Sequence, residues 1–399
     1  MKFSRRADAV TPFYAMEYGR RAAEIEARGA HVVKLNIGEP DFGAPPAFLS
    51  EIRRIADGRP MPYTGATGTG ELRAAIAEFS RDRLSAPIAP ERVVVTTGAS
   101  AALLLSCAAL IDPGDEVLVA DPSYPCNRRF AESFGANVRL VPTGPATRFQ
   151  LDAAAVEASW TDRTRGVITA SPANPTGTSL PYDDLLALTG AVADRGGWRI
   201  VDEIYLGLAD DAPDGTAPRS IAAADPGAIV VNSFSKYFGM TGWRLGWMVV
   251  PEEMIPVAEK LAQNYFICPP TPAQVAALAC FTPETIALAE ERRAILRGRR
   301  QLVLDGLAEI GLPVPVTPDG AFYVYVDVSG TGLSASEFCD QALDRERVAL
   351  TPGKDFGEIG AEQYVRLSYA TSEDDLNEGL SRLGEFLVGS SAEARTARR

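Results

Sequence analysis

Four polar residues lie at or just after the ends of short β-branched runs, where strands of a sheet are expected to stop. Lys236 has an amine that can form a Schiff base with an aldehyde. Asp202 has a carboxylate that can pair with a protonated pyridine nitrogen, and Asn174 and Tyr205 can donate hydrogen bonds to a ring phenolate. Together these residues predict a site for an aromatic aldehyde cofactor.

Other groups in the same pattern are suited to an anionic phosphate on that cofactor. The backbone amides of residues 98–101 open an expected helix, whose N-terminus favours an anion. Tyr124 offers a flat face on which a ring can stack. The candidate phosphate ligands are Gly98, Ala99, Ser100, Ser233, Ser235 and Arg244. Each motif is weak by itself, because a single lysine is most often a solvated charge and N-P-T-G is typical of a turn.

The composition excludes several other chemistries. His31 is the one histidine among 399 residues, so a zinc site with several imidazoles cannot form, and any histidine-based triad would depend on His31 alone. The five cysteines include no C-x-x-C pair, and no metal site is predicted. With 39 basic and 52 acidic residues the net charge is −13, which argues against nucleic acid and anionic lipid as partners.

The elements that must position these residues follow an alternating pattern of strands and helices. Continuous apolar runs indicate a mostly parallel sheet that is covered on both faces, an α/β architecture in which ligands lie beyond the carboxyl ends of the strands. The expected strands are 93–97, 116–120, 137–141, 166–170, 199–202, 228–233 and 246–250. This pattern predicts a large domain with a seven-stranded sheet.

The pattern changes after Pro272 to long helices, followed by a smaller α+β part. The expected helices there are 273–281, 283–310, 334–345 and 372–387, with strands at 321–328, 348–350 and 364–369. We expect three parts: an N-terminal segment 1–45 that packs with the small domain, a large domain 46–283 and a small domain 284–399. The tail 390–399 is expected to be disordered.

The N-terminus lacks the apolar core of a signal peptide, and the longest apolar run, 101–111, is too short to span a membrane. A cytoplasmic enzyme without a membrane partner is therefore expected.

In the order and spacing of its motifs, the chain from about residue 13 to 387 resembles the fold type I pyridoxal-phosphate enzymes of aminotransferase class I/II. The matching motifs are N-I-G-E-P at 36–40, Y-x-x-x-x-G-x-x-E-L-R at 63–73, S-P-x-N-P-T-G at 171–177, D-E-x-Y at 202–205, S-x-S-K at 233–236, G-x-R-x-G at 242–246 and R-L-S at 366–368. The resemblance implies pyridoxal 5'-phosphate as cofactor and an α-amino acid and a 2-oxo acid as substrates.

The resemblance also implies a role for each matching residue. Lys236 would hold the cofactor as a Schiff base and move the substrate α-proton, and Asp202 would keep the pyridine nitrogen protonated. Tyr205 and Asn174 would bind the ring oxygen. Arg366 would bind the substrate carboxylate in a bidentate pair, helped by Asn174.

Further implied contacts come from Gly38, whose backbone would assist Arg366, and from the phosphate ligands named above. Tyr63 would reach the phosphate in the neighbouring subunit, which implies a homodimer with shared active sites.

Two departures from the family bear on the substrate. The loop 98–100 reads Gly-Ala-Ser where one branch that handles aspartate has a lysine, and no basic residue occurs at 264–270, where another branch has an arginine. We therefore expect small neutral substrates such as alanine or valine with pyruvate, unless Arg20 or Arg21 replaces the missing cation.

Three alternatives stay open at this point. An aspartate aminotransferase, or a carbon–sulfur β-lyase or aminocyclopropane carboxylate synthase-like enzyme on the same fold, would use the same residues. A cofactor-binding regulator without turnover would need an attached DNA-binding domain, and the acidic chain shows none.

Overall fold

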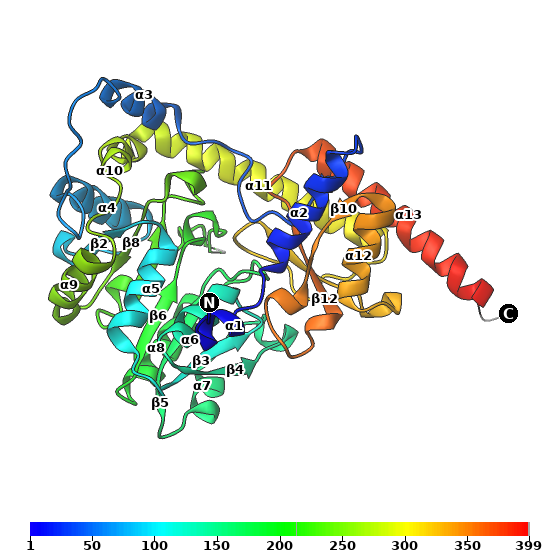
Figure 1. Cartoon of the computed structure of the whole chain (residues 1–399), viewed down its shortest axis with the longest axis horizontal. Helices are drawn as coiled ribbons and strands as arrows, with labels where there is room; N and C mark the ends of the chain where they lie inside the picture. The colour runs from blue at the N-terminus through cyan, green and yellow to red at the C-terminus, as the bar shows by residue number, and fades with distance from the viewer. Residues whose placement is uncertain (213, 398–399) are drawn as a thin grey trace.

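A seven-stranded sheet forms the centre of the larger part of the molecule in the computed structural model, which describes residues 1–212 and 214–397 (Figure 1). The strand order is β2-β8-β7-β6-β5-β3-β4, and the strands from β7 to β4 are parallel, whereas β8 runs antiparallel to both neighbours. The strands are β2 (Val93–Thr96), β3 (Glu116–Asp121), β4 (Asn137–Pro142), β5 (Thr164–Ala170), β6 (Trp198–Asp202), β7 (Ile229–Ser233) and β8 (Gly246–Val249). The predicted α/β fold with a mostly parallel sheet is confirmed.

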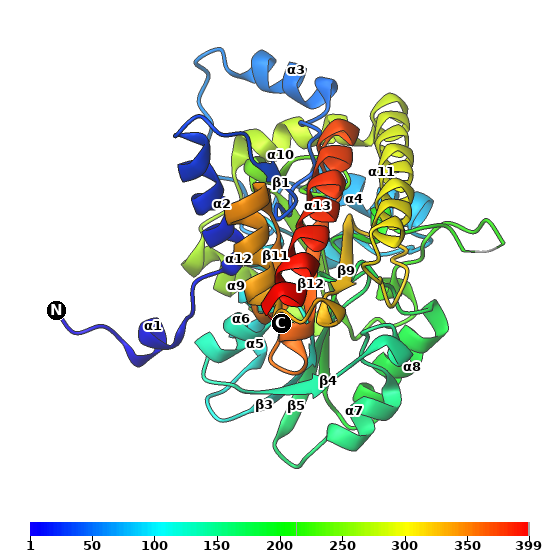
Figure 2. The same ribbon diagram turned by 90° about the vertical axis from the view of Figure 1, so that its right-hand side faces the viewer.

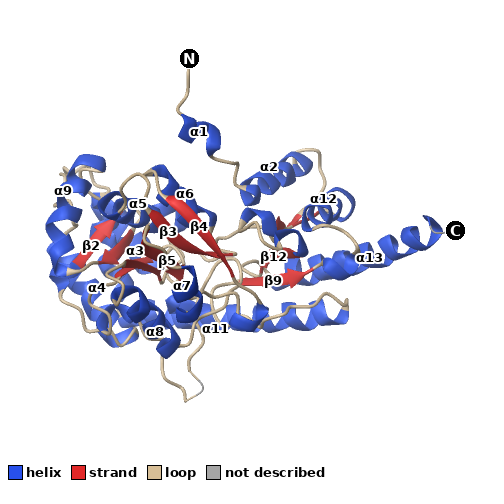
Figure 3. Cartoon of the chain, turned by 90° about the horizontal axis from the view of Figure 1, so that it is seen from below, coloured by secondary structure: helices blue, strands red, loops and turns tan. Residues whose placement is uncertain are grey.

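Both faces of the central strands are buried, because helices cover the sheet on either side (Figure 3). Ile200 and Val231 pack on one face with α5 (Ala99–Leu110) and α9 (Ile255–Tyr265). Val201 and Val230 pack on the opposite face, toward α4 (Gly70–Arg83). Burial on both faces explains why these strands read as continuous apolar runs.

The remaining helices around this sheet are α3 (Pro46–Ile55), α6 (Pro125–Ser133), α7 (Ala153–Ser159), α8 (Tyr182–Ala193) and α10 (Thr271–Ala277). The long α11 (Pro283–Glu309) begins at the N-cap Thr282, whose hydroxyl accepts a hydrogen bond from the backbone N–H of Thr285. It runs from the seven-stranded sheet to the smaller part of the molecule (Figure 1).

The smaller part has its own antiparallel sheet, β11-β12-β9, formed by β9 (Tyr323–Asp327), β11 (Thr351–Pro352) and β12 (Tyr364–Ser368). Two helices, α12 (Ala335–Glu346) and α13 (Glu373–Ala397), pack beside it (Figure 2). The N-terminal β1 (Val33–Lys34) pairs with β10 (Val348–Ala349), and α2 (Tyr14–Glu26) packs near β10 and β11 of the smaller part. The short α1 (Arg5–Ala9) projects from the body of the molecule (Figure 2).

One expectation about this part is wrong. The segment 390–399 was expected to be disordered, but α13 continues as a helix to Ala397, and residues 398–399 lie outside the described part of the chain. The physical reason is that no proline or glycine follows Gly389, and alanine, glutamate and arginine favour a helix. The predicted domain boundaries at 45/46 and 283/284 stay predictions. A search of the described helices finds none that could cross a lipid bilayer.

Candidate active site

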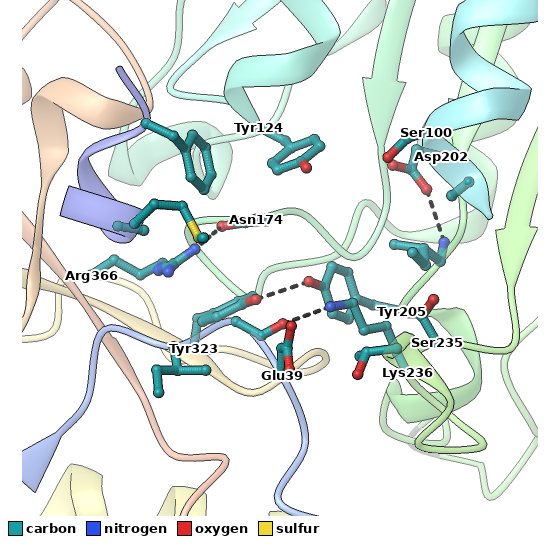
Figure 4. A pocket seen from close by; sticks show the side chains of 18 of the residues that line it. Glu39, Ser100, Tyr124, Asn174, Asp202, Tyr205, Ser235, Lys236, Tyr323 and Arg366 are labelled. Atoms are coloured by element: carbon teal, nitrogen blue, oxygen red, sulfur yellow. Dashed lines mark hydrogen bonds between the residues drawn. The ribbon is translucent and has the colours of Figure 1, made fainter. Parts of the chain in front are cut away.

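A cavity of about 670 Å³ opens beyond the carboxyl ends of the parallel strands, between the two sheets. Most of the residues predicted for the site line it: Gly38, Ala99, Ser100, Tyr124, Asn174, Asp202, Tyr205, Ser235, Lys236, Arg244 and Arg366 (Figure 4). They come from segments up to 328 residues apart, Gly38 to Arg366, so the fold brings together what the motifs only suggested.

Lys236 follows β7 and projects into the cavity, where its Nζ donates a hydrogen bond of 2.6 Å to the carbonyl oxygen of Gly38. Burial lowers the pKa of Lys236 to about 8, because desolvation disfavours the charged amine. The carboxylates of Glu39 and Asp202 oppose this shift, whereas the guanidinium of Arg366 adds to it. An amine that loses its proton near neutral pH is suited to attack a carbonyl and to act as a base.

Asp202 ends β6 and is 5% exposed. Its Oδ1 accepts a hydrogen bond from the backbone N–H of Ile204 at 3.0 Å, the one hydrogen bond of this carboxylate among the described residues. Burial raises the pKa of Asp202 to about 6, since no cation is close enough to offset the lost hydration fully. A buried carboxylate with an unused oxygen at a cavity wall is suited to bind a cationic ring nitrogen.

The end of the cavity at the N-terminus of α5 is rich in hydrogen-bond donors. Ser100, Ser235 and Arg244 face it, and a Cβ built on Gly98 would lie 2.7 Å from Nη2 of Arg244. Gly98 has φ +79°, so glycine is required both by the backbone and by the close approach of the guanidinium. Ser233 does not line the cavity, but its Oγ lies 2.8 Å from Oγ of Ser235. It can therefore orient that hydroxyl.

Arg366 lies at the opposite end, on β12, and is only 2% exposed. Its Nη1 donates to Oδ1 of Asn174 at 2.9 Å and its Nη2 donates to the carbonyl oxygen of Asn36 at 2.8 Å. The guanidinium carbon lies 4.4 Å from the ring centre of Tyr323 and 4.8 Å from that of Phe356. Within the described part of the chain, the buried Nε of Arg366 has no hydrogen-bond partner. Such a fixed guanidinium is suited to bind a carboxylate.

The hydroxyl groups of Tyr205 and Tyr323 form a hydrogen bond at the cavity, with their oxygens 2.9 Å apart (Figure 4). Tyr124 lies across from them at the wall formed by the start of α6, and the ring of Phe13 meets it edge to face at 6.2 Å. Aromatic side chains thus line the cavity from both sides, and the ring of Tyr124 is suited to stack on an aromatic cofactor.

Several cavity residues were missed or treated as structural in the sequence. Glu39 was not among the predicted site residues, but it lines the cavity, and its carboxylate acts to raise the pKa of Lys236. Tyr323 carries no motif, and only its position on a predicted strand could have pointed to it. Met16 and Ile37 also line the wall. Tyr63 lies outside the cavity with 77% of its surface exposed, so its predicted role in a neighbouring subunit stays a prediction.

The family comparison agrees with this geometry. The model for aminotransferase class I and II matches residues 30–383. The chain belongs to this family. The enzyme is an aminotransferase, and members of its family use pyridoxal phosphate.

Similar proteins cover nearly the whole of this aminotransferase. A valine–pyruvate aminotransferase of Mycobacterium tuberculosis is 40% identical over 381 residues, which is 95% of this chain and 97% of that protein. An aspartate/prephenate aminotransferase of Thermus thermophilus is 36% identical over 390 residues, with 96% and 98% covered. The crystal structure of an aminotransferase from M. tuberculosis superposes with a TM-score of 0.93 at 40% identity, covering 98% of this chain and 100% of that one.

The cavity of the aminotransferase fits pyridoxal phosphate. Asp202 presents an unpaired oxygen for a protonated ring nitrogen, and the amides at the start of α5 with Arg244 form a cradle that a side chain on Gly98 would fill. Ser100 and Ser235 add hydroxyl donors at the same end. The donor set thus matches a pyridine ring at one place and a phosphate at the other.

Proposed function

We propose that the enzyme transfers amino groups between small neutral α-amino acids, such as valine or alanine, and pyruvate. The observation that carries this proposal is that the guanidinium of Arg20 is already ion-paired. Four basic residues line the cavity within the described part of the chain, Arg20, Lys236, Arg244 and Arg366, and the last three are already assigned to the cofactor and the α-carboxylate. Arg20 forms ion pairs with both Glu17 and Glu24 on its own helix.

The paired state of Arg20 argues against a dicarboxylate substrate, because two carboxylates already occupy the guanidinium. Arg21, the other candidate cation, is paired with Asp340 and Asp344 and does not line the cavity. A distal carboxylate would therefore lose hydration without gaining a free cation.

Apolar side chains on the substrate side of the cavity support the same proposal. Phe13, Met16 and Ile37 line the same cavity as Arg366, the residue that would hold the α-carboxylate. Each methylene of a substrate that they bury gains about 0.8 kcal/mol. The name of the M. tuberculosis relative, which acts on valine and pyruvate, agrees with this preference.

The proposed roles of the residues follow from their positions. When bound, pyridoxal phosphate supplies an aldehyde and an electron-withdrawing ring. Lys236 would hold the cofactor through its aldehyde, and as a free amine its Nζ would remove the substrate α-proton. Arg366 and Asn174 would orient the substrate by its α-carboxylate, and Asp202 would bind the protonated ring nitrogen.

We also propose a cytoplasmic homodimer, in which Tyr63 of each subunit contributes to the other's phosphate site. Its exposure in the single chain supports this arrangement, because a tyrosine that is 77% exposed is available to a partner. The division into segment 1–45, large domain 46–283 and small domain 284–399 belongs to the same proposal.

Single half-reactions test the substrate. The holoenzyme is mixed with valine, alanine or aspartate, and the change in cofactor absorbance gives kcat/KM for each donor. We expect valine and alanine to exceed aspartate by at least about tenfold, equivalent to 1.4 kcal/mol. If aspartate exceeds both by tenfold, the enzyme is an aspartate aminotransferase and the interpretation of Arg20 is wrong.

A further inference from the structure

Residues 36–43, which we call the 36–43 segment, lie in the connection from β1 to α3, and the first four of them, 36–39, line the cavity. The carbonyl oxygen of Gly38 in this segment accepts the hydrogen bond from Nζ of Lys236. At its first end the segment is fixed by Asn36, whose Nδ2 donates to the carbonyl oxygen of Ala15 at 2.8 Å and whose own carbonyl oxygen accepts from Arg366. The carbonyl oxygen that accepts the hydrogen bond from Lys236 therefore lies in a segment that is fixed by the hydrogen bonds of Asn36.

The second end of the segment is held by α11. Nη1 of Arg299 donates to Oδ1 of Asp41 at 2.8 Å, and Nη1 of Arg292 donates to the carbonyl oxygen of Gly43 at 2.9 Å. The guanidinium carbons of both arginines lie 5.3 Å from the ring centre of Phe42. The side chain of Arg299 is 9% exposed, and its buried Nε has no hydrogen-bond partner among the residues that the structure describes. The ion pair with Asp41 offsets the hydration that the guanidinium of Arg299 loses on burial.

These contacts give a use to the basic run 292–300, which the sequence leaves unexplained. Its other arginines bind a different loop: Arg293 contacts the carbonyl oxygen of Ala209, and Arg297 and Arg300 pair with Asp210. Each arginine of the run therefore has an internal partner. Among the arginines of this run, only Arg292 and Arg299 contact the 36–43 segment.

We propose that Arg299 is a positioning residue of the reaction, which acts through Asp41 to hold the Gly38 carbonyl where it receives the ammonium of Lys236 after the lysine leaves the cofactor. The inference rests on the proposed assignment of Lys236 as the cofactor lysine. Arg299 itself does not line the cavity and touches no reacting atom.

The charges around Lys236 determine the direction of the expected effect. Glu39 and Asp202 favour the ammonium, and Arg366 and Arg244 disfavour it. The hydroxyls of Tyr205, Tyr323 and Tyr124 face the same cavity. A hydrogen bond accepted from the ammonium favours the charged form, so a displaced Gly38 carbonyl lowers the pKa of Lys236 further.

Two variants loosen the anchor in different ways, Arg299→Gln and the milder, isosteric Asp41→Asn. The matched control is Arg297→Gln, which removes an ion pair from the same helix but releases the loop at 210–211 instead. The holoenzyme is first converted by the amino donor to its aminated form, in which Lys236 is free. Competitive labelling of lysines across a pH series, followed by mass spectrometry, then gives the pKa of Lys236 directly. The second readout is the pH profile of kcat/KM for the reaction of this aminated form with pyruvate, because Lys236 is free in the starting enzyme.

We expect both test variants to lower the pKa of Lys236 by about 0.5–1 unit, a part of the roughly one to two units that a whole hydrogen bond to a charged group provides. The acid limb of the pH profile should move to lower pH by the same amount, and the control should keep the wild-type values. The double variant with Asp41→Asn and Arg299→Gln should have the same pKa of Lys236 as the single variants, because both substitutions break the same ion pair.

Two results would overturn the inference or its basis, and they differ. If borohydride reduction of the wild type attaches the cofactor to a residue other than Lys236, the proposed site assignment fails. If the cofactor is attached at Lys236 but the labelling pKa is unchanged in Asp41→Asn and Arg299→Gln, the ion pair is only structural and the positioning role is wrong.

Discussion

The substitution Arg366→Lys tests the proposed carboxylate site most directly. In the wild type, Arg366 is held by Asn174 and by the carbonyl oxygen of Asn36, and its guanidinium lies between two aromatic rings. A lysine keeps the positive charge, but its single ammonium cannot present two parallel donors while keeping both existing contacts. The substrate carboxylate therefore loses at least one charge-assisted hydrogen bond.

The size of the loss follows from that count. One hydrogen bond to a charged group contributes about 1.5–3 kcal/mol. Because 1.36 kcal/mol corresponds to a factor of ten in rate, kcat/KM for valine should fall by about 10- to 150-fold. The buried oxygen of Asn36 or Asn174 that loses its donor should also lower the free energy of unfolding by about 1–3 kcal/mol.

The assay separates these two effects with a pair of donors. Valine and 2-methylpropylamine differ only in the carboxylate, so the amine reports every consequence of the substitution except the lost carboxylate contact. We expect the half-reaction with valine to slow by the factor above and the slow reaction with the amine to change less than about threefold. Arg293→Lys, at a buried arginine outside the cavity, controls for general destabilisation. Equal slowing of both donors in Arg366→Lys would refute the reasoning.

The remaining predictions concern the cofactor, the dimer and pH. Lys236→Ala should fold with an unchanged melting temperature and bind the cofactor without a covalent bond, and borohydride should then attach no cofactor; an attached cofactor would contradict the assignment. Gly98→Ala should weaken cofactor binding at least about tenfold in equilibrium dialysis, because its Cβ would lie 2.7 Å from Arg244 at a φ of +79°; wild-type affinity would show that the guanidinium is not held there. Mixing Lys236→Ala with an inactive Tyr63 variant should restore activity through hybrid dimers, and a fully active monomer in sedimentation would exclude shared sites. Burial raises the pKa of Glu203 to about 7 from 4.5, so the folded state binds more protons and stability falls as pH rises from 4.5 to 7. Denaturation curves at each pH give the free energy of unfolding, and in Glu203→Gln it should not show this decrease, which is on the order of 2–3 kcal/mol in the wild type. The same pH dependence in both proteins would disprove the prediction.

The arrangement of the larger sheet could be predicted because its strands are short and buried on both faces. The strand that ends at Asp202 starts one residue earlier than predicted, at Trp198, and the others differ by at most two residues at either end. Parallel strands place their carboxyl ends at one edge, so motifs that each follow a strand had to meet there. Lys236, Asp202 and Asn174 were therefore predictable as neighbours.

Residues that reach the cavity from irregular or unremarkable segments were not predictable in the same way. Tyr323 lies on a strand of the small sheet, and only its long-range contacts with Tyr205 and Arg366 reveal its position. The pairing of Arg20 depends on side-chain rotamers within one helix face, which the sequence allows but does not require. The ion pair between Asp41 and Arg299 joins residues 258 positions apart, and no local pattern relates them.

The two walls of the cavity differ in how freely they can change during evolution. The cofactor wall consists of strand ends and of Gly98, where one added carbon atom already collides with a guanidinium. The facing wall includes Met16, which is 71% exposed, and Ile37, which is 40% exposed. Substitutions at exposed positions ordinarily change stability by less than about 0.5 kcal/mol. Substitutions in the wall that is proposed to contact the amino donor can therefore accumulate with little loss of stability, while the wall proposed to bind the cofactor tolerates few changes.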